Sequence, residues 1–429
     1  MVESSVKESQ QLSNFRIKLP SKSSNNSHIS EIIHEFTDHL YKDQGVEALC
    51  VRFDEADKYI GASYTNGSLR VFNSITGKSS LTFMNNFSQI EDIKAPINMF
   101  RFKPSGIQGG SHGSSSHTRD MIVCVTTDGR IQYWHIPTSK CVHQIVPTTE
   151  DSQQSLSDHF DQDEVINQKR RSSKPSSLPG QTNIEQTLNC LDFNCTSEKL
   201  AVAGNDAKVK IYDDNSTDKD LLMTLRSTGK MHPGHSNRIF ALKFSNTDEN
   251  MLYSAGWDDT VQINDLRVGG PIDQIAGTHV CGDSIDVIDN LLVAGSYRNQ
   301  RNLQIYDLRK SNKVLQNVEF DNTSTLQSNY FSECQVYASQ FYKQFSSTGA
   351  KIIATGATGG RNEVRFFESF LNEDVEEIGQ NNLVAGFKST FSITDFSGGV
   401  QCLDFANKSN RIVLGTSKGM ICSFKFKMI

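Results

Sequence analysis

The chain has 429 residues, of which 36% are hydrophobic and 21% are charged, and its formal net charge is −6. This balance predicts a folded body with polar surface loops and disfavours nucleic acid as the main ligand, because such proteins usually carry a basic excess. No stretch approaches the roughly 18 apolar residues of a membrane span, and Met1–Lys22 holds no apolar run typical of a signal peptide. We therefore expect a cytoplasmic protein, with the nucleus also open, and no membrane partner.

The N-terminal part divides near residue 28. Residues 1–28 are polar and are predicted to form a disordered tail, whereas residues 29–429 are predicted to form the folded domain. At the start of that domain, Ile32–Thr37 favours a strand.

A polar turn followed by an alternating strand then recurs along the chain. Alternation with a period of two residues predicts β-strands, and a further apolar strand precedes nearly every copy, as at Ala48–Phe53. The pattern therefore predicts an all-β fold of seven similar units. The seven copies are Thr65–Phe72, Thr127–Trp134, Asn205–Tyr212, Trp257–Asn264, Arg301–Tyr306, Arg361–Phe367 and Ser417–Phe424.

Three insertions separate these units. The largest, residues 148–187, is acidic and then basic and is predicted to be disordered, because one aromatic residue cannot build a core. In its basic run, Ser173 follows Arg170 and Arg171 and is therefore a candidate phosphorylation site. Smaller insertions are predicted at residues 105–118 and 372–396, and the second suggests a short helix or an extra strand.

The clearest unit begins at Gly234-His235 and ends with the run Asp258–Asp265. With the other copies in register, it resembles the WD-repeat family over Ile32–Ile429. That resemblance implies one seven-bladed β-propeller. It also implies that Ile32–Thr37 supplies the outer strand of the last blade, because the chain ends after three strands of that blade.

The same resemblance implies a hydrogen-bonded network inside the fourth blade, formed by His235, Ser254 and Asp258. In the family a Trp completes this network, but here Asn264 stands in its place, so we expect the network to be incomplete. Although Ser, His and Asp are also the components of a hydrolase triad, the repeat context makes these three residues structural.

Nine cysteines lie mostly in apolar runs without a CxxC pair, which indicates buried thiols in a reducing compartment. His112 and His117 lie in a Gly/Ser-rich insertion without Cys or Asp partners, so no metal site is expected. We also expect no cofactor.

The residues just before the turns should face the narrow end of the propeller, where WD-repeat proteins often take a partner peptide. Trp257 is the one large aromatic residue at these positions, and Arg238, Tyr297 and Arg298 should lie nearby. Trp, Tyr and Arg dominate binding hot spots. We therefore predict a peptide-binding site at these four residues.

Function follows from this platform-like fold. The main hypothesis is a non-catalytic scaffold, monomeric within a larger cytoplasmic or cytoskeletal complex, such as ciliary or axonemal machinery. An alternative is a substrate receptor of a cullin-type ubiquitin ligase, because Ile305–Arg309 resembles an adaptor-docking box through Tyr306, Asp307 and Arg309. An enzyme is disfavoured, since the sequence shows no Gly-rich phosphate loop, metal cluster or nucleophile elbow.

Overall fold

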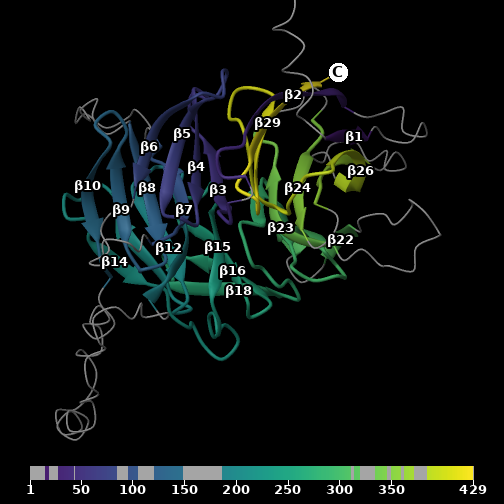
Figure 1. The fold of residues 1–429 in the computed structure, drawn as a ribbon. Coiled ribbons are helices and arrows are strands. Elements are labelled where there is room, and N and C mark those ends of the chain that lie inside the picture. Colours follow the sequence, from purple (N-terminus) through teal and green to yellow (C-terminus); the bar gives the residue numbers. More distant parts are fainter. Residues whose placement is uncertain are drawn as a thin grey trace, which may run out of the picture.

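The computed structural model describes residues 15–18, 28–42, 44–84, 95–104, 120–147, 186–310, 314–318, 334–344, 349–358, 362–371 and 384–428 (Figure 1). These residues form seven antiparallel sheets. The first strand of each sheet packs beside the first strand of the next, and the first strand of the last sheet packs beside that of the first. The sheets are therefore the seven blades of a closed β-propeller, as the sequence predicts.

Each blade is built outward from the axis of the ring. Blades 1 and 2 are β3 (Ala48–Phe53), β4 (Tyr59–Tyr64), β5 (Ser68–Asn73), β6 (Ser79–Met84), and β7 (Ile97–Phe102), β8 (Met121–Thr126), β9 (Ile131–His135), β10 (Lys140–Ile145). Blades 3 and 4 are β11 (Leu188–Phe193), β12 (Lys199–Gly204), β13 (Val209–Asp213), β14 (Leu221–Thr224), and β15 (Ile239–Phe244), β16 (Met251–Gly256), β17 (Thr260–Asp265), β18 (Gly270–Ala276).

The remaining blades follow the same plan. Blade 5 is β19 (Ile285–Ile288), β20 (Leu291–Gly295), β21 (Leu303–Asp307) and β22 (Val314–Val318), and blade 6 is β23 (Gln335–Phe341), β24 (Ile352–Thr358), β25 (Val364–Leu371) and β26 (Val384–Thr394). Blade 7 is β27 (Val400–Phe405), β28 (Arg411–Thr416), β29 (Ile421–Met428) and β2 (Ile29–Asp38). A 3-10 turn follows β21 at Leu308–Lys310, and no helix among the described residues is long and apolar enough to cross a bilayer.

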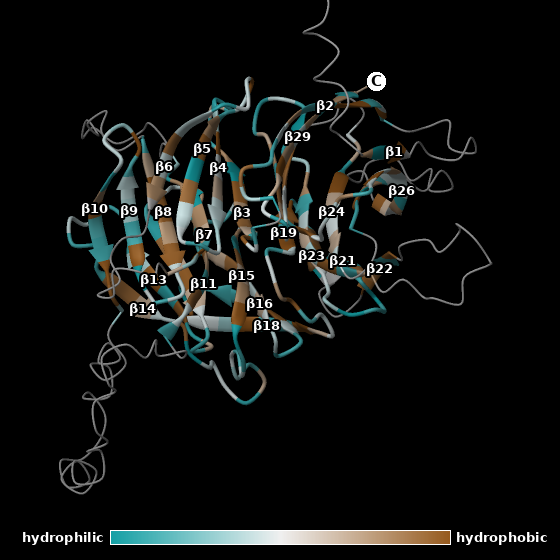
Figure 2. Cartoon of the chain, viewed as in Figure 1, coloured by the Kyte–Doolittle hydropathy of each residue, from teal (hydrophilic) through white to brown (hydrophobic). Residues whose placement is uncertain are grey.

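Burial explains why the second strands of the blades are largely apolar. Because neighbouring blades cover both faces of β12 and β16, these strands bury nearly every side chain. The outer strand β10 instead alternates exposed and half-buried positions, and it is largely hydrophilic where β8 is hydrophobic (Figure 2).

The N-terminal strand closes the ring. β2 pairs antiparallel with β29, with Ile32 opposite Phe426 and Thr37 opposite Cys422. The predicted overlap of the two chain ends in blade 7 is therefore confirmed, over a slightly longer strand. Closure in this way leaves neither terminal blade with a free edge at the join.

Two stretches correct the sequence analysis. Arg16–Lys18 forms β1, a fifth strand on the outer edge of blade 6, although residues 1–28 were predicted to be disordered. Three residues are too few to show alternation, and the strand is held by Phe15, whose ring centroid lies 4.9 Å from that of Phe396. Within the predicted insertion 372–396, β26 is the ordinary outer strand of blade 6. The predictions for residues 105–118, 148–185 and 372–383 lie outside the described residues.

A shared β-bulge shapes the wall of the central channel. In six blades the pairing of the first two strands shifts at the same place, four residues before the residue that ends the first strand. A bulge inserts one unpaired residue and redirects side chains. In blade 5 the equivalent residue, Asp283, lies ahead of the shortened strand β19.

Candidate functional site

Trp257 lies in the turn between β16 and β17, and 38% of it is exposed. This turn is at the end of the ring where second strands pass to third strands, which we call the turn face. The indole ring is nevertheless held from several sides. Its Nε1–H donates to Sγ of Cys281 at 3.0 Å, and ring centroids of Phe240 and His279 lie 5.3 and 6.0 Å away.

Of the other three predicted binding residues, Arg238 contacts this indole directly, and Tyr297 is joined to it through His279. The Arg238 guanidinium lies 5.1 Å from the Trp257 ring centroid, in cation–π geometry. His279, which stacks on Trp257, accepts a backbone hydrogen bond at 2.8 Å from the amide of Tyr297. The structure therefore brings the predicted residues together across blades 4 and 5. We call Arg238, Trp257, His279, Tyr297 and Arg298 the Trp257 platform.

Asp259 was missed by the sequence analysis, and it links the two sides of the platform. Its carboxylate contacts Nδ1 of His279 at 2.7 Å and also pairs with the guanidinium of Arg298. Arg298 is thus an anchored part of the platform and carries no free charge. The sequence offers a signal for it, the second Asp of Asp258-Asp259. This residue adopts a positive φ of 61°, and its side chain contacts residues of blade 5.

Such a fixed and partly exposed aromatic side chain suits binding. Ordering a rotamer-rich side chain at an interface costs about 0.5–1.5 kcal/mol, and here the contacts of Trp257 are already formed. Burial raises the pKa of the Cys281 thiol to about 11, which outweighs the opposing hydrogen bond from Trp257. Cys281 therefore stays protonated at neutral pH and serves as an acceptor for the indole, not as a nucleophile.

The network of blade 4 forms as predicted but is more complete than expected. His235 contacts Asp258 through Nδ1 at 2.7 Å and Ser254 through Nε2 at 2.8 Å. Asn264, which the sequence analysis took as a break, donates its Nδ2–H to Ser254 Oγ at 3.0 Å and to the carbonyl of Leu252 at 3.2 Å. A side-chain amide replaces the indole because both donate an N–H.

Charge and burial make this network structural. Burial alone would raise the pKa of Asp258, but hydrogen bonds from His235, Ser236 and Thr260 outweigh it and hold that pKa below its ordinary value. Ser254 is fully buried. A nucleophile must reach its substrate, so this Ser-His-Asp geometry cannot act as a hydrolase triad in the folded protein.

The predicted adaptor-docking residues do not form one exposed cluster. Tyr306 is 1% exposed and packs inside blade 5. Arg309 makes a bidentate pair with Asp307, at 2.8 and 2.6 Å. The same pairing recurs in blade 4 between Arg267 and Asp265. The Asp and Arg two residues apart are therefore explained by a local turn that both blades share.

Two further predictions fall on residues that the structure does not describe. These are the candidate phosphorylation site Ser173 and the pair His112 and His117. Among the residues that it does describe, no group of three or more His, Cys, Asp or Glu is placed to hold a metal ion.

The channel holds a second cluster, which the sequence analysis did not single out. It is formed by one residue near the end of each first strand, the second-to-last residue in six blades and Asp286 in blade 5. A carboxylate or amide at this position accepts a hydrogen bond from the backbone of the next blade, as Asp404 does from Phe53 at 2.8 Å. Equivalent bonds join Asp192 to Phe244, Asp286 to Phe341 and Gln340 to Phe405, at 2.8, 2.9 and 2.7 Å.

The cations of this cluster pair with those carboxylates. Around the ring the residues are Arg52, Arg101, Asp192, Lys243, Asp286, Gln340 and Asp404. Arg101 contacts Asp192 at 3.1 Å, Lys243 contacts Asp286 at 3.0 Å, and Lys343 contacts Asp404 at 2.9 Å. We call these residues, with Asp283 and Lys343, the channel network.

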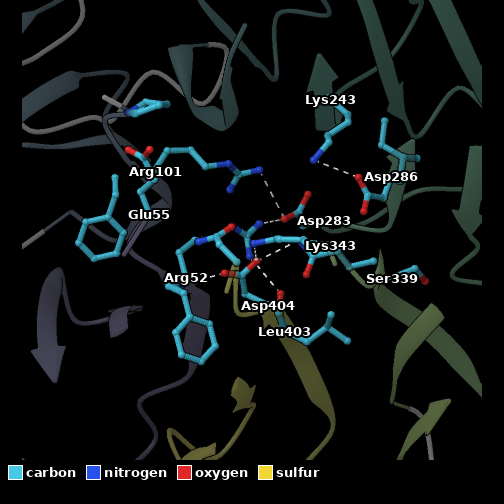
Figure 3. A pocket seen from close by; sticks show the side chains of 16 residues that line it. Arg52, Glu55, Arg101, Lys243, Asp283, Asp286, Ser339, Lys343, Leu403 and Asp404 are labelled. Carbon is cyan, nitrogen blue, oxygen red and sulfur yellow. Dashed lines mark hydrogen bonds and ion pairs between the residues drawn. The ribbon is translucent and has the colours of Figure 1, made fainter. Parts of the chain in front are cut away.

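One place in the ring sets two like charges side by side. Arg52 and Arg101 belong to neighbouring blades, and Asp283 of blade 5 lies between their guanidinium groups across the channel (Figure 3). A cavity of about 200 Å³ remains beside this cluster. Because each of the four cations already has a carboxylate partner, the cluster ties blades together and offers no free charge to a ligand.

Burial strengthens these pairs. Burial alone would raise the pKa of Asp404, but Lys343 and Arg52 outweigh it and hold that pKa below its ordinary value. A signal for the network is present in the sequence, since a polar residue precedes Phe in six first strands, as in Val51-Arg52-Phe53 and Leu403-Asp404-Phe405.

Comparison with known proteins agrees with this architecture. The family model described as WD domain, G-beta repeat matches residues 173–213 and 226–265, which include the first three strands of blades 3 and 4. No curated protein matches the chain. The matched repeats, together with seven blades closed by the N-terminal strand, show that this chain is a seven-bladed β-propeller that contains WD repeats.

Proposed function

We propose that this propeller is a non-catalytic scaffold that binds a peptide segment of a partner protein on the Trp257 platform. The observation that carries the proposal is an indole that is 38% exposed and yet held by Cys281, His279 and Arg238. WD-repeat propellers are generally interaction domains, and their function resides in surface sites. Exposed aromatic residues with fixed geometry are the usual centres of such sites.

The scaffold is proposed to act as one subunit of a larger cytoplasmic or cytoskeletal assembly, with ciliary machinery as one setting and the nucleus as another. Nine free cysteines support a reducing compartment. The alternative, a receptor of a cullin-type ubiquitin ligase, rests on Tyr306, Asp307 and Arg309 alone. The burial of Tyr306 and the local pairing of Arg309 favour the scaffold over this alternative.

The test is partner recovery by affinity purification and mass spectrometry from matched lysates. The double variant Trp257→Ala, Arg298→Ala should lose its main partners by about 30-fold or more, the cost of removing a hot spot. Its melting temperature should fall modestly, because the variant loses the surface contacts of Trp257 and the pair of Arg298 with Asp259 but keeps the cores of the blades.

The control is the double variant Phe370→Ala, Arg309→Ala, which removes an equally exposed aromatic–arginine pair elsewhere. It should recover the wild-type partners. Loss of partners from the control alone would reject the Trp257 platform and favour a blade-edge site around Arg309.

A further inference from the structure

The turn face carries cations that have no carboxylate partner. Its carboxylates are mostly engaged: Asp128 with Arg130, Asp206 with Lys210, Asp258 with His235, Asp259 with Arg298 and Asp395 with Arg16. The exception is Glu47, which accepts a hydrogen bond from Gln401 at 2.9 Å. Within the described ranges, five cations on this face make no ion pair: Lys42, Lys208, Arg238, Arg301 and Lys418.

Two of these cations belong to the blades that form the Trp257 platform, Arg238 to blade 4 and Arg301 to blade 5. Arg238 lies over the indole, where its guanidinium keeps N–H donors for a further partner. Arg301 is exposed at the end of the blade 5 turn, which is closed by a bond of 2.7 Å from the Ser296 amide to the Asn302 carbonyl. Arg301 lies in the same turn as Arg298, which pairs with Asp259 of the platform. Each of the two blades that form the platform thus contributes one uncompensated positive charge, on a chain whose net charge is −6.

We propose that the partner segment is acidic: an apolar or aromatic side chain packs on Trp257, and neighbouring Asp or Glu side chains pair with Arg238 and Arg301. This inference rests on the proposed function and specifies its ligand. Charge complementarity supports it, because a basic segment would place like charges together at this site. A carboxylate can also take two hydrogen bonds from one guanidinium, which fixes the orientation of the segment.

The test begins with a displayed library of random 12-residue peptides selected on the full-length chain. The strongest binder is then synthesised with fluorescein in two forms, as selected and with every Asp and Glu replaced by Asn and Gln. Dissociation constants are measured by anisotropy in about 50 mM and 300 mM salt. Salt should weaken binding of the selected form most, because exposed charges are screened over about a Debye length.

The variants are Trp257→Ala, Arg238→Glu and Arg238→Lys. The matched control is Arg226→Glu, an exposed arginine whose backbone amide bonds to Gly269. Trp257→Ala should abolish binding, Arg238→Glu should weaken the acidic peptide about tenfold or more, and Arg238→Lys should weaken it less. Arg226→Glu should bind as the wild type does.

The outcomes separate the two proposals. The selected peptides could require Trp257 and yet be neutral or basic, with unchanged affinity for Arg238→Glu. That result would overturn the acidic ligand and leave the proposed function supported. Selected peptides that bind the folded Trp257→Ala variant unchanged would overturn both. A fluorescein-labelled thymidine oligonucleotide that binds the wild type and not Trp257→Ala would replace the acidic peptide with nucleic acid, since aromatic and cationic residues also stack and pair with single strands.

Discussion

The Trp257 platform and the channel network are built from similar residue types and differ in how they are satisfied. In the channel, Arg52, Lys243 and Lys343 each pair with a carboxylate. Two of these carboxylates, Asp286 and Asp404, also accept a hydrogen bond from the backbone of the next blade. On the turn face, Arg238 and Arg301 have no such partner among the described residues. Arg238 lies over a partly exposed indole, and Arg301 is in the blade 5 turn that contributes Tyr297 and Arg298. A polar cluster whose charges and donors are all paired with one another supports the fold. A cluster that keeps unused donors beside an apolar surface can bind another molecule.

Deletion of residues 1–44 should have the largest effect, because it opens the ring and disturbs both regions. It removes β2 and leaves β29 with an unpaired edge. The cooperative melting transition of the wild type should be lost or moved to a much lower temperature. Deletion of residues 1–27 removes only β1 and the contacts of Phe15 and should cost about 2 kcal/mol or less. Equal melting of the wild type and the longer deletion would contradict the closure.

Asp404→Ala should break the channel network while sparing the Trp257 platform. It leaves Lys343 without its carboxylate partner and the amide of Phe53 without its acceptor, whereas Arg52 keeps its ion pair with Asp283. Removing one partner of a buried pair costs about 3–5 kcal/mol, to be measured as the free energy of unfolding in urea. Asp404→Asn should cost less, because it retains an oxygen for Phe53. Peptide binding by the folded fraction should be unchanged, and a loss of binding would show that the two regions are coupled.

Asp258→Asn tests the network beside the platform and its dependence on pH. The variant should lower the free energy of unfolding by about 1–3 kcal/mol at pH 7, the range for an unsatisfied buried group. The pKa of Asp258 is lower in the folded protein than its ordinary value, so the unfolded chain takes up this proton first as pH falls. The wild type should therefore be more stable than Asp258→Asn above about pH 4, and this difference in the free energy of unfolding should disappear at lower pH. A difference between the two proteins that grows on acidification would contradict this assignment.

Arg309→Ala should have the smallest effect. Its side chain is 48% exposed and pairs with Asp307 at the surface, and such pairs contribute less than about 1 kcal/mol. Thermal melting and partner recovery should both resemble the wild type. A selective loss of a ubiquitin-ligase adaptor from this variant would revive the alternative function.

Sequence alone determined the architecture because each blade repeats the same local pattern. Polar turns and two-residue alternation recur seven times, and the count of strands after Val400 required one more from the N-terminus, which β2 supplies. The internal Ser-His-Asp contacts of blade 4 were predictable for the same reason. The choice of Trp257, Arg238, Tyr297 and Arg298 as neighbours also followed from repeat register.

Tertiary structure decided the contacts that join different blades. Asp283 reaches Arg52 from the opposite part of the ring, and no local spacing predicts such a partner. Asn264 completes a network that family resemblance marked as broken, because a hydrogen-bond donor is required there and an amide supplies one. β1 forms because blade 6 offers an edge to three residues that have no strand pattern of their own. Local patterns thus define the blades, and long-range pairing of charges, donors and edges defines how the blades meet.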